Sequence, residues 1–162
     1  MWQTVFAATN LVALAGWIVL LAMPRRPLPL ALVLYGAVAL LCLAYAVMFA
    51  GLFGGWADPV ASAGAPPPDL SDYSVAGLMD FFRSEGGVVL GWTHYLAFDL
   101  FVGLWIARDA DGKGFSRLVQ APFLLATFLA GPIGLIAWLI VRERRARGDG
   151  GWSRKGKTPA GG

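Results

Sequence analysis

Long apolar stretches separated by short polar turns dominate the pattern of this chain. Four of them are long enough to cross a hydrocarbon core of about 30 Å, which takes about 20 helical residues. They cover residues 5–23, 28–53, 88–107 and 118–141. The pattern predicts an all-α integral membrane protein, a four-helix bundle over residues 1–147 followed by a disordered Gly-rich basic tail over residues 148–162.

The longest polar segment, residues 54–87, separates the second and third stretches. Three consecutive prolines at 66–68 exclude a helix there. Beyond them, apolar residues recur at the spacing of a helix face. They are Val75, Leu78, Met79 and Phe82. We expect one amphipathic helix at the membrane surface, with Asp69 or Ser71 as its N-cap.

Composition agrees with a membrane protein, because 57% of residues are hydrophobic and only 14% are charged. The single cysteine, Cys42, excludes an intramolecular disulfide and is read as a small hydrophobic residue of the second stretch. The opening residues are hydrophobic and do not look like an organelle import signal, so the expected location is a bacterial inner membrane.

Basic residues give two opposing indications of orientation. Seven follow the fourth stretch: Arg142, Arg144, Arg145, Arg147, Arg154, Lys155 and Lys157. A basic run beside a span favours attraction to anionic lipid over nucleic-acid binding. Four spans would place both termini on one side, which the tail indicates is the cytoplasm. Five basic residues in the short turns favour the opposite orientation: Arg25, Arg26, Arg108, Lys113 and Arg117.

The third stretch carries the candidate chemistry. It contains the only histidine, His94, and an aspartate, Asp99, and ionisable groups inside a membrane span are costly enough to mark function. On a helix His94 shares a face with Phe98 and Phe101. Asp99 lies about 140° away around the axis, on the face of Trp92 and Tyr95. The two groups therefore need a broad pocket or different neighbouring helices.

Several further residues are candidates for binding a flat ligand. They are Asn10, Trp92, Tyr95, Phe98, Phe101 and Trp105. The alternative is that the aromatic rings only pack and that Asn10, His94 and Asp99 hydrogen-bond between helices. Glu85 lies at the mouth of the third helix. In the fourth stretch Gly131 and Pro132 interrupt the backbone ladder, as a pocket wall or a packing kink.

One histidine cannot supply a di-iron centre or bis-histidine haem, and the chain lacks a nucleotide-binding glycine loop, a zinc constellation and a GxSxG motif. We therefore predict no metal and no cofactor. Any chemistry must use carboxylates and one imidazole.

Three motifs resemble the neoxanthin-synthase-like membrane proteins, relatives of the plant protein whose loss causes abscisic-acid deficiency. The most specific is SE…W.H…DLF…DG, formed by Ser84, Glu85, Trp92, His94, Asp99, Leu100, Phe101, Asp111 and Gly112. The others are F…N…W…P and GP.GL. The first of these consists of Phe6, Asn10, Trp17 and Pro24. The second consists of Gly131, Pro132, Gly134 and Leu135. The resemblance covers residues 6–142.

The resemblance implies carotenoid chemistry, since the plant members are required to convert violaxanthin to neoxanthin, an isomerisation without net redox change. Such a reaction needs a proton donor to open the epoxide and a base to remove a proton from the polyene. We expect Asp99 as the buried acid, His94 as base or orienting group, and Glu85 at the pocket mouth. In a bacterium the substrate would be another carotenoid or an apocarotenoid.

Two alternatives stay open. The chain could be a non-catalytic carotenoid- or lipid-binding subunit of a pigment or photosynthetic complex, with His94 and Asp99 structural. It could also be an ion-coupled transporter that uses Asp99 in an oligomer. The expected partners are a carotenoid or other lipophilic polyene, membrane lipid, and a second copy or a pathway complex, but no nucleic acid.

Overall fold

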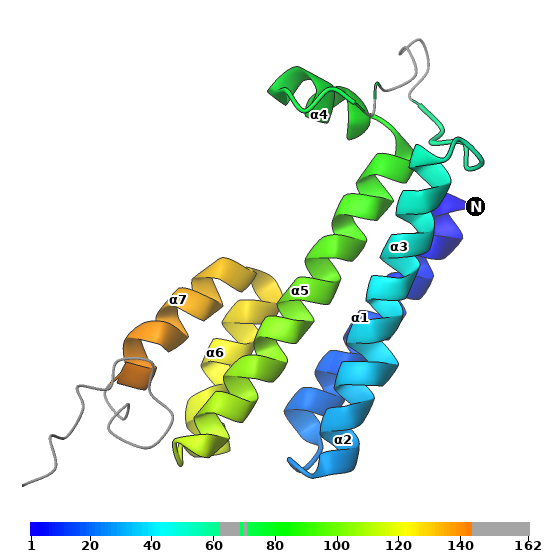
Figure 1. The fold of residues 1–162 in the computed structure, drawn as a ribbon. Helices are drawn as coiled ribbons and strands as arrows, with labels where there is room; N and C mark the ends of the chain where they lie inside the picture. Colours follow the sequence, from blue (N-terminus) through cyan, green and yellow to red (C-terminus); the bar gives the residue numbers. More distant parts are fainter. Residues whose placement is uncertain (62–68, 70, 144–162) are drawn as a thin grey trace, which may run out of the picture. The chain divides into compact units, whose positions relative to one another are not determined.

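The computed structural model describes residues 1–61, 69 and 71–143, and these residues form helices without a β-strand (Figure 1). The tail predicted over residues 148–162 lies outside the described residues. Contacts divide the chain into two parts, Met1–Phe101 and a second part that begins at Val102.

Three helical stretches are long and apolar enough to cross a membrane, judged by length and composition. They are α1 (Trp2–Ala22), the continuous stretch Pro27–Phe53, and α5 (Glu85–Gly112). The first three predicted spans are therefore confirmed as helices of spanning length. The middle stretch consists of α2 (Pro27–Ala31), η1 (Leu32–Val38) and α3 (Ala39–Phe53).

In the first part α1 and α5 run in the same direction. Trp2 lies against Gly86, where an added Cβ would come within 2.9 Å of the indole, and Gly16 lies against Leu100. The second stretch runs the opposite way, because Leu52 lies against Gly86 while Ala37 lies against Gly16. The result is an up-down-up arrangement of three apolar helices.

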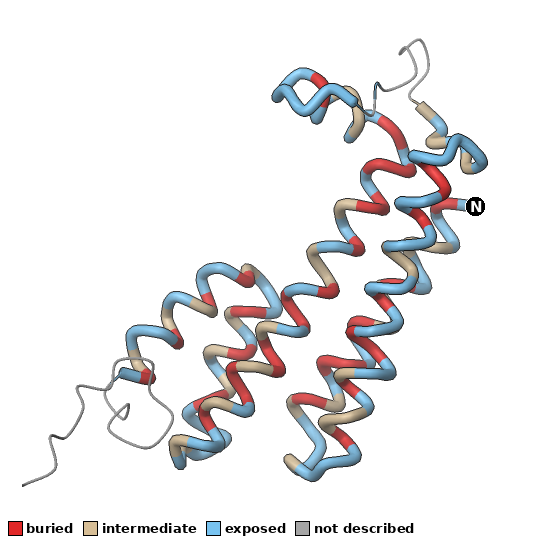
Figure 2. Tube along the Cα trace, in the orientation of Figure 1, coloured by how far each residue is buried: buried red, intermediate tan, exposed pale blue. Residues whose placement is uncertain are grey.

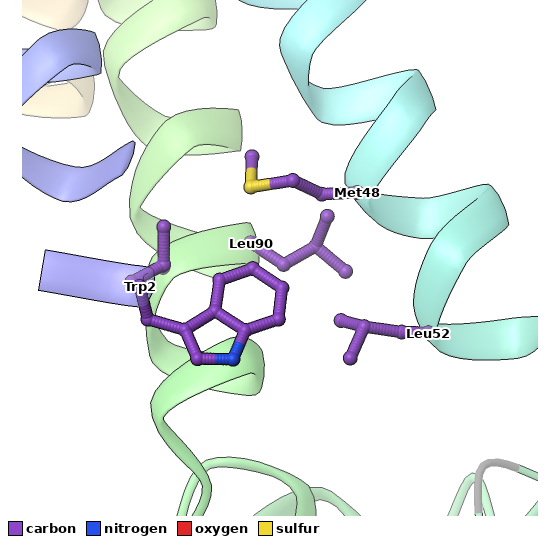
Figure 3. Packing of buried hydrophobic residues seen from close by; sticks show 5 residues of the cluster. Trp2, Met48, Leu52 and Leu90 are labelled. Atoms are coloured by element: carbon purple, nitrogen blue, oxygen red, sulfur yellow. The ribbon is translucent and has the colours of Figure 1, made fainter. Parts of the chain in front are cut away.

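A hydrophobic cluster fixes the end of the first part where α1 and α5 begin. Its buried members are Trp2, Met48, Leu52, Val89 and Leu90. Figure 3 shows the Trp2 indole beside Leu90, with Met48 and Leu52 projecting from α3. The Trp2 indole N–H also donates to the Asp58 carbonyl at 2.9 Å. This hydrogen bond ties the start of α1 to the loop after α3.

The outer faces of α1 and α3 are apolar yet exposed, as the pale blue segments of Figure 2 indicate. Leu11 is 68% exposed and Leu43 is 61% exposed. Exposed aliphatic surface of this extent is what lipid-facing helices present.

The helix predicted in this segment is confirmed as α4 (Val75–Phe81). Its place at the membrane surface stays a prediction. The predicted N-cap is wrong. Ser74, not Asp69 or Ser71, accepts the hydrogen bond from the Gly77 N–H, at 3.1 Å. Asp69 instead accepts from Ser71 within the preceding turn.

Residues 118–141, predicted as the fourth span, do not form one continuous helix, and the four-helix bundle is not confirmed. Two shorter helices occupy this region, α6 (Arg117–Leu129) and α7 (Gly131–Arg142). The chain reverses at Ala130, which ends α6 and precedes α7 with φ −158° and ψ 80°. Pro132 lacks a backbone N–H and cannot continue the ladder of α6, so the apolar run breaks here.

Candidate functional site

An apolar cavity of about 430 Å³ opens on the first part, between the second helical stretch and α5. Its lining is aliphatic and aromatic apart from one thiol and one phenol. The lining residues are Leu34, Tyr35, Val38, Ala39, Cys42, Ala97, Phe98 and Phe101. Three of these belong to η1, and π-helical turns are frequent at functional sites. We call this space the central cavity.

His94 lies beside the central cavity through its contact with Phe98. The two rings stack with centroids 4.5 Å apart and planes inclined by 21°. Tyr45 of α3 also contacts His94, with ring centroids 5.5 Å apart and planes inclined by 59°. His94 is exposed. The imidazole thus contacts two aromatic rings and is still accessible to a ligand.

A second, smaller cavity of about 130 Å³ lies toward the end of α3. Its apolar wall continues the aromatic series, because Tyr45, Phe49 and Phe53 stack in sequence with centroids 6.0 and 4.2 Å apart. The remaining lining residues are Asp69, Asp72, Tyr73, Gly77, Leu78, Phe81 and Leu90. We call this space the end cavity. Unlike the central cavity, it has carboxylates at its rim.

The Asp69 carboxylate at that rim is held by its own turn. The Ser71 hydroxyl donates to Asp69 Oδ1 at 2.7 Å and the Ser71 backbone N–H donates at 2.9 Å. These hydrogen bonds stabilise the charged form and lower the pKa of Asp69. The rim is therefore acidic near neutral pH.

Trp92, Tyr95 and Asn10 form a separate group on the side of α5 that faces α1. The Trp92 indole N–H donates to Asn10 Oδ1 at 3.0 Å, and the Asn10 amide donates to the Phe6 carbonyl at 2.7 Å. The Trp92 ring also lies 5.3 Å from the Tyr95 ring. Neither cavity includes these three residues among its lining. Of the predicted binding residues in the first part, only Phe98 and Phe101 line the central cavity, and these three lie apart from it.

Asp99 is buried, with 8% of its surface exposed, and lies on a different face of α5 from His94. The five-residue separation corresponds to about 140° around the helix axis. His94 contacts Tyr45 of α3, whereas Trp92, which precedes Asp99 by two helical turns on the same face, donates to Asn10 of α1. The structure keeps the predicted acid and base in separate surroundings.

Glu85 is exposed in the first turn of α5. The surrounding backbone is well held: the Glu85 and Gly86 N–H groups donate to the Val60 and Pro59 carbonyls at 3.2 and 2.9 Å. The Ser84 hydroxyl accepts from the Gly87 N–H at 3.0 Å and so caps the helix. Glu85 thus occupies a hydrogen-bonded helix start and lines neither cavity.

Trp105 belongs to the second part and lines neither cavity. The Arg142 guanidinium lies over its ring, 5.6 Å from the centroid. Arg142 is also held by Asp109, which sequence reasoning did not select. Among the described residues, no group of three or more His, Cys, Asp and Glu side chains is placed to hold a metal ion.

The fold and the site define a class: a small all-helical protein with three helices of membrane-spanning length and an aromatic-lined apolar cavity. The chain belongs to the ABA DEFICIENT 4-like family, whose model matches residues 4–138. The resemblance drawn from the helix motifs is thereby confirmed. No curated protein and no solved structure matches the chain.

Proposed function

We propose that this protein binds a carotenoid in its membrane domain and rearranges it by acid–base catalysis without net redox change. Family membership supports a neoxanthin-synthase-like role. The single observation that carries the proposal in this chain is the central cavity with His94 beside it.

The two cavities follow one side of a single helical stretch, and this favours an elongated ligand. Their lining residues recur from Leu34 to Phe53 at helical spacing. This distance is about 28 Å at 1.5 Å per residue. A carotenoid has a length comparable to the hydrocarbon core, about 30 Å. The central cavity would hold an apolar part of the ligand, and the acidic rim of the end cavity would receive a polar end group.

Stacked aromatic rings distinguish this surface from one that only contacts lipid tails. The rings of Phe98, His94 and Tyr45 follow one another at 4.5 and 5.5 Å. A conjugated polyene is flat and polarisable, so it packs on ring faces better than a flexible acyl chain does. The proposal therefore favours a polyene over an ordinary lipid.

In the proposed reaction a donor protonates the leaving oxygen while a base removes a proton from carbon, so that one proton is gained and one is lost. His94 is assigned as the base, because imidazole is the general base that enzymes use most often and its ring stacks on Phe98 of the central cavity. Asp99 is assigned as the proton donor and Glu85 as a group at the mouth. For Asp99 to act, the ligand has to reach the face of α5 that meets α1.

One observation favours a second candidate, a non-catalytic carotenoid-binding subunit. His94 and Asp99 occupy different faces of α5. A binding protein needs only the cavities and the ring series, with Asp99 in a structural role. The two candidates predict different pigments in the same experiment.

That experiment is chromatography of pigments from bacterial hosts that accumulate different carotenoids, with and without this protein. The variants are His94→Gln and Asp99→Asn, and Arg108→Gln on an exposed position of the same helix is the matched control. A new pigment that persists in the control and disappears in His94→Gln and Asp99→Asn supports the enzyme. Unchanged carotenoid that co-purifies with the protein supports the binding subunit. Folded protein with neither result contradicts both.

A further inference from the structure

Neither α6 nor α7 is long enough to cross a membrane. α6 has 13 residues and α7 has 12. At 1.5 Å per residue they measure about 20 and 18 Å, against a hydrocarbon core of about 30 Å.

The reversal brings α6 and α7 side by side (Figure 1). A Cβ added to Gly134 would overlap the backbone and hydroxyl of Thr127, so the two helices meet without an intervening side chain. Thr127 is fully buried there and donates its hydroxyl proton to the Phe123 carbonyl at 2.8 Å. The two helices form a closely packed hairpin.

The end of α7 returns to the level at which α5 ends. Arg142 Nε and Nη2 donate to the two Asp109 carboxylate oxygens at 2.8 and 2.9 Å, and the Trp138 indole N–H donates at 3.0 Å. Asp109 lies three residues before the last residue of α5, Gly112. The chain therefore leaves α5, turns into α6, and comes back in α7 to the end from which it departed.

From this geometry we propose that α6 and α7 form a re-entrant hairpin, so that the chain crosses the membrane three times and Arg142 lies on the side opposite the N-terminus. α1 and α5 begin together at Trp2 and Gly86. Each is long enough to cross, so each ends on the other side. Non-helical backbone at membrane depth is tolerated where protein buries it, as at Ala130 between two packed helices.

The distribution of charge supports this topology independently. In it, six of the seven Lys and Arg among the described residues lie on the side where α1 and α5 end, and the exception is Arg83. The opposite side carries Asp58, Asp69, Asp72, Asp80 and Glu85. Basic residues in short segments beside spans favour the cytoplasm. A four-span topology would instead place the basic turns and the basic tail on opposite sides of the membrane. The three-span topology places them on the same side.

The proposal replaces the expectation that both termini share a side. It places the N-terminus and the acidic rim of the end cavity away from the cytoplasm. If the proposed function holds, the polar end of the ligand faces that side. The topology itself does not depend on any ligand, so its test and the pigment experiment can fail separately.

The test is cysteine labelling of the full chain in a Cys42→Ala background. Single variants Ser71→Cys, Ser116→Cys and Ser153→Cys are exposed to a membrane-impermeant maleimide, first in intact spheroplasts and then after lysis. We expect Ser71→Cys to react in intact spheroplasts and the other two only after lysis. Ser116→Cys is the internal control, because three-span and four-span topologies both place it opposite Ser71.

Labelling of Ser71→Cys and Ser153→Cys from the same side would overturn the re-entrant hairpin. Labelling of Ser116→Cys in intact spheroplasts would overturn the cytoplasmic assignment. A reporter that fluoresces only in the cytoplasm, fused after Gly162 of the unsubstituted chain, gives a second measurement. It is expected to fluoresce, while the same reporter fused before Met1 stays dark; the reverse pattern contradicts the proposal.

Discussion

Arg142 and Asp109 form the most consequential polar contact in the second part of the chain, and its removal should be costly. The Arg142 and Asp109 side chains are only 4% and 13% exposed. Asp109 accepts hydrogen bonds from Arg142 and Trp138, and Lys113 lies 3.4 Å away. Removing one partner of a buried ion pair costs about 3–5 kcal/mol, because the other charge is left without compensation. Since Lys113 remains, we expect Arg142→Met to lower the free energy of unfolding by about 3 kcal/mol, the lower end of that range.

The matched control is Arg83→Met, which removes the 2.7 Å contact with Asp80 between side chains that are 57% and 44% exposed. Exposed pairs of this kind contribute about 0.5 kcal/mol. Unfolding would be measured by SDS titration in mixed micelles, followed by circular dichroism. The triple variant Asp109→Leu, Lys113→Met, Arg142→Met should lose less than Arg142→Met alone, because it removes all three charges of this cluster together. Equal losses for Arg142→Met and Arg83→Met would refute this account of the pair.

Two further substitutions test packing and capping. Gly134→Ala should destabilise the α6–α7 hairpin by about 1–3 kcal/mol, because even its Cβ has no room beside Thr127. The control is Gly36→Ala, where an added Cβ meets nothing within 4 Å. It should stabilise by up to about 1 kcal/mol in the same SDS titration, because alanine is the better helix former, and equal effects of the two variants would contradict the close crossing. Ser74→Ala should weaken α4 by about 1 kcal/mol through loss of its N-cap, seen as faster hydrogen exchange of the α4 amides. Unchanged exchange would show that the Ser74 hydroxyl does not stabilise the helix.

Hydropathy and helical spacing predicted the features that depend on local sequence. They located three long apolar helices and α4, and they put His94 on one face with Phe98 and Phe101. They also predicted that the backbone ladder breaks at Gly131 and Pro132. These predictions succeed because apolar runs, proline geometry and the helix period act over a few residues.

What the sequence did not reveal depends on residues that are distant along the chain. The break near Pro132 could mark a kink or a full reversal, and only the return of Arg142 to Asp109, 33 residues away, distinguishes them. The central cavity joins η1, α3 and α5, so no local pattern predicts it. A carboxylate among several cations at the end of an apolar stretch was the one available signal for Asp109.

The central claim, that the cavity beside His94 holds a polyene, is tested most directly at Cys42. This residue lines the central cavity and is the only cysteine in the chain. Purified protein would be treated with a membrane-permeant maleimide with and without bound carotenoid, and the labelling rate of Cys42 compared. The account predicts several-fold slower labelling with carotenoid present, and restored labelling in Phe98→Ala if that ring holds the ligand. Identical rates with and without bound carotenoid would contradict a ligand in this cavity.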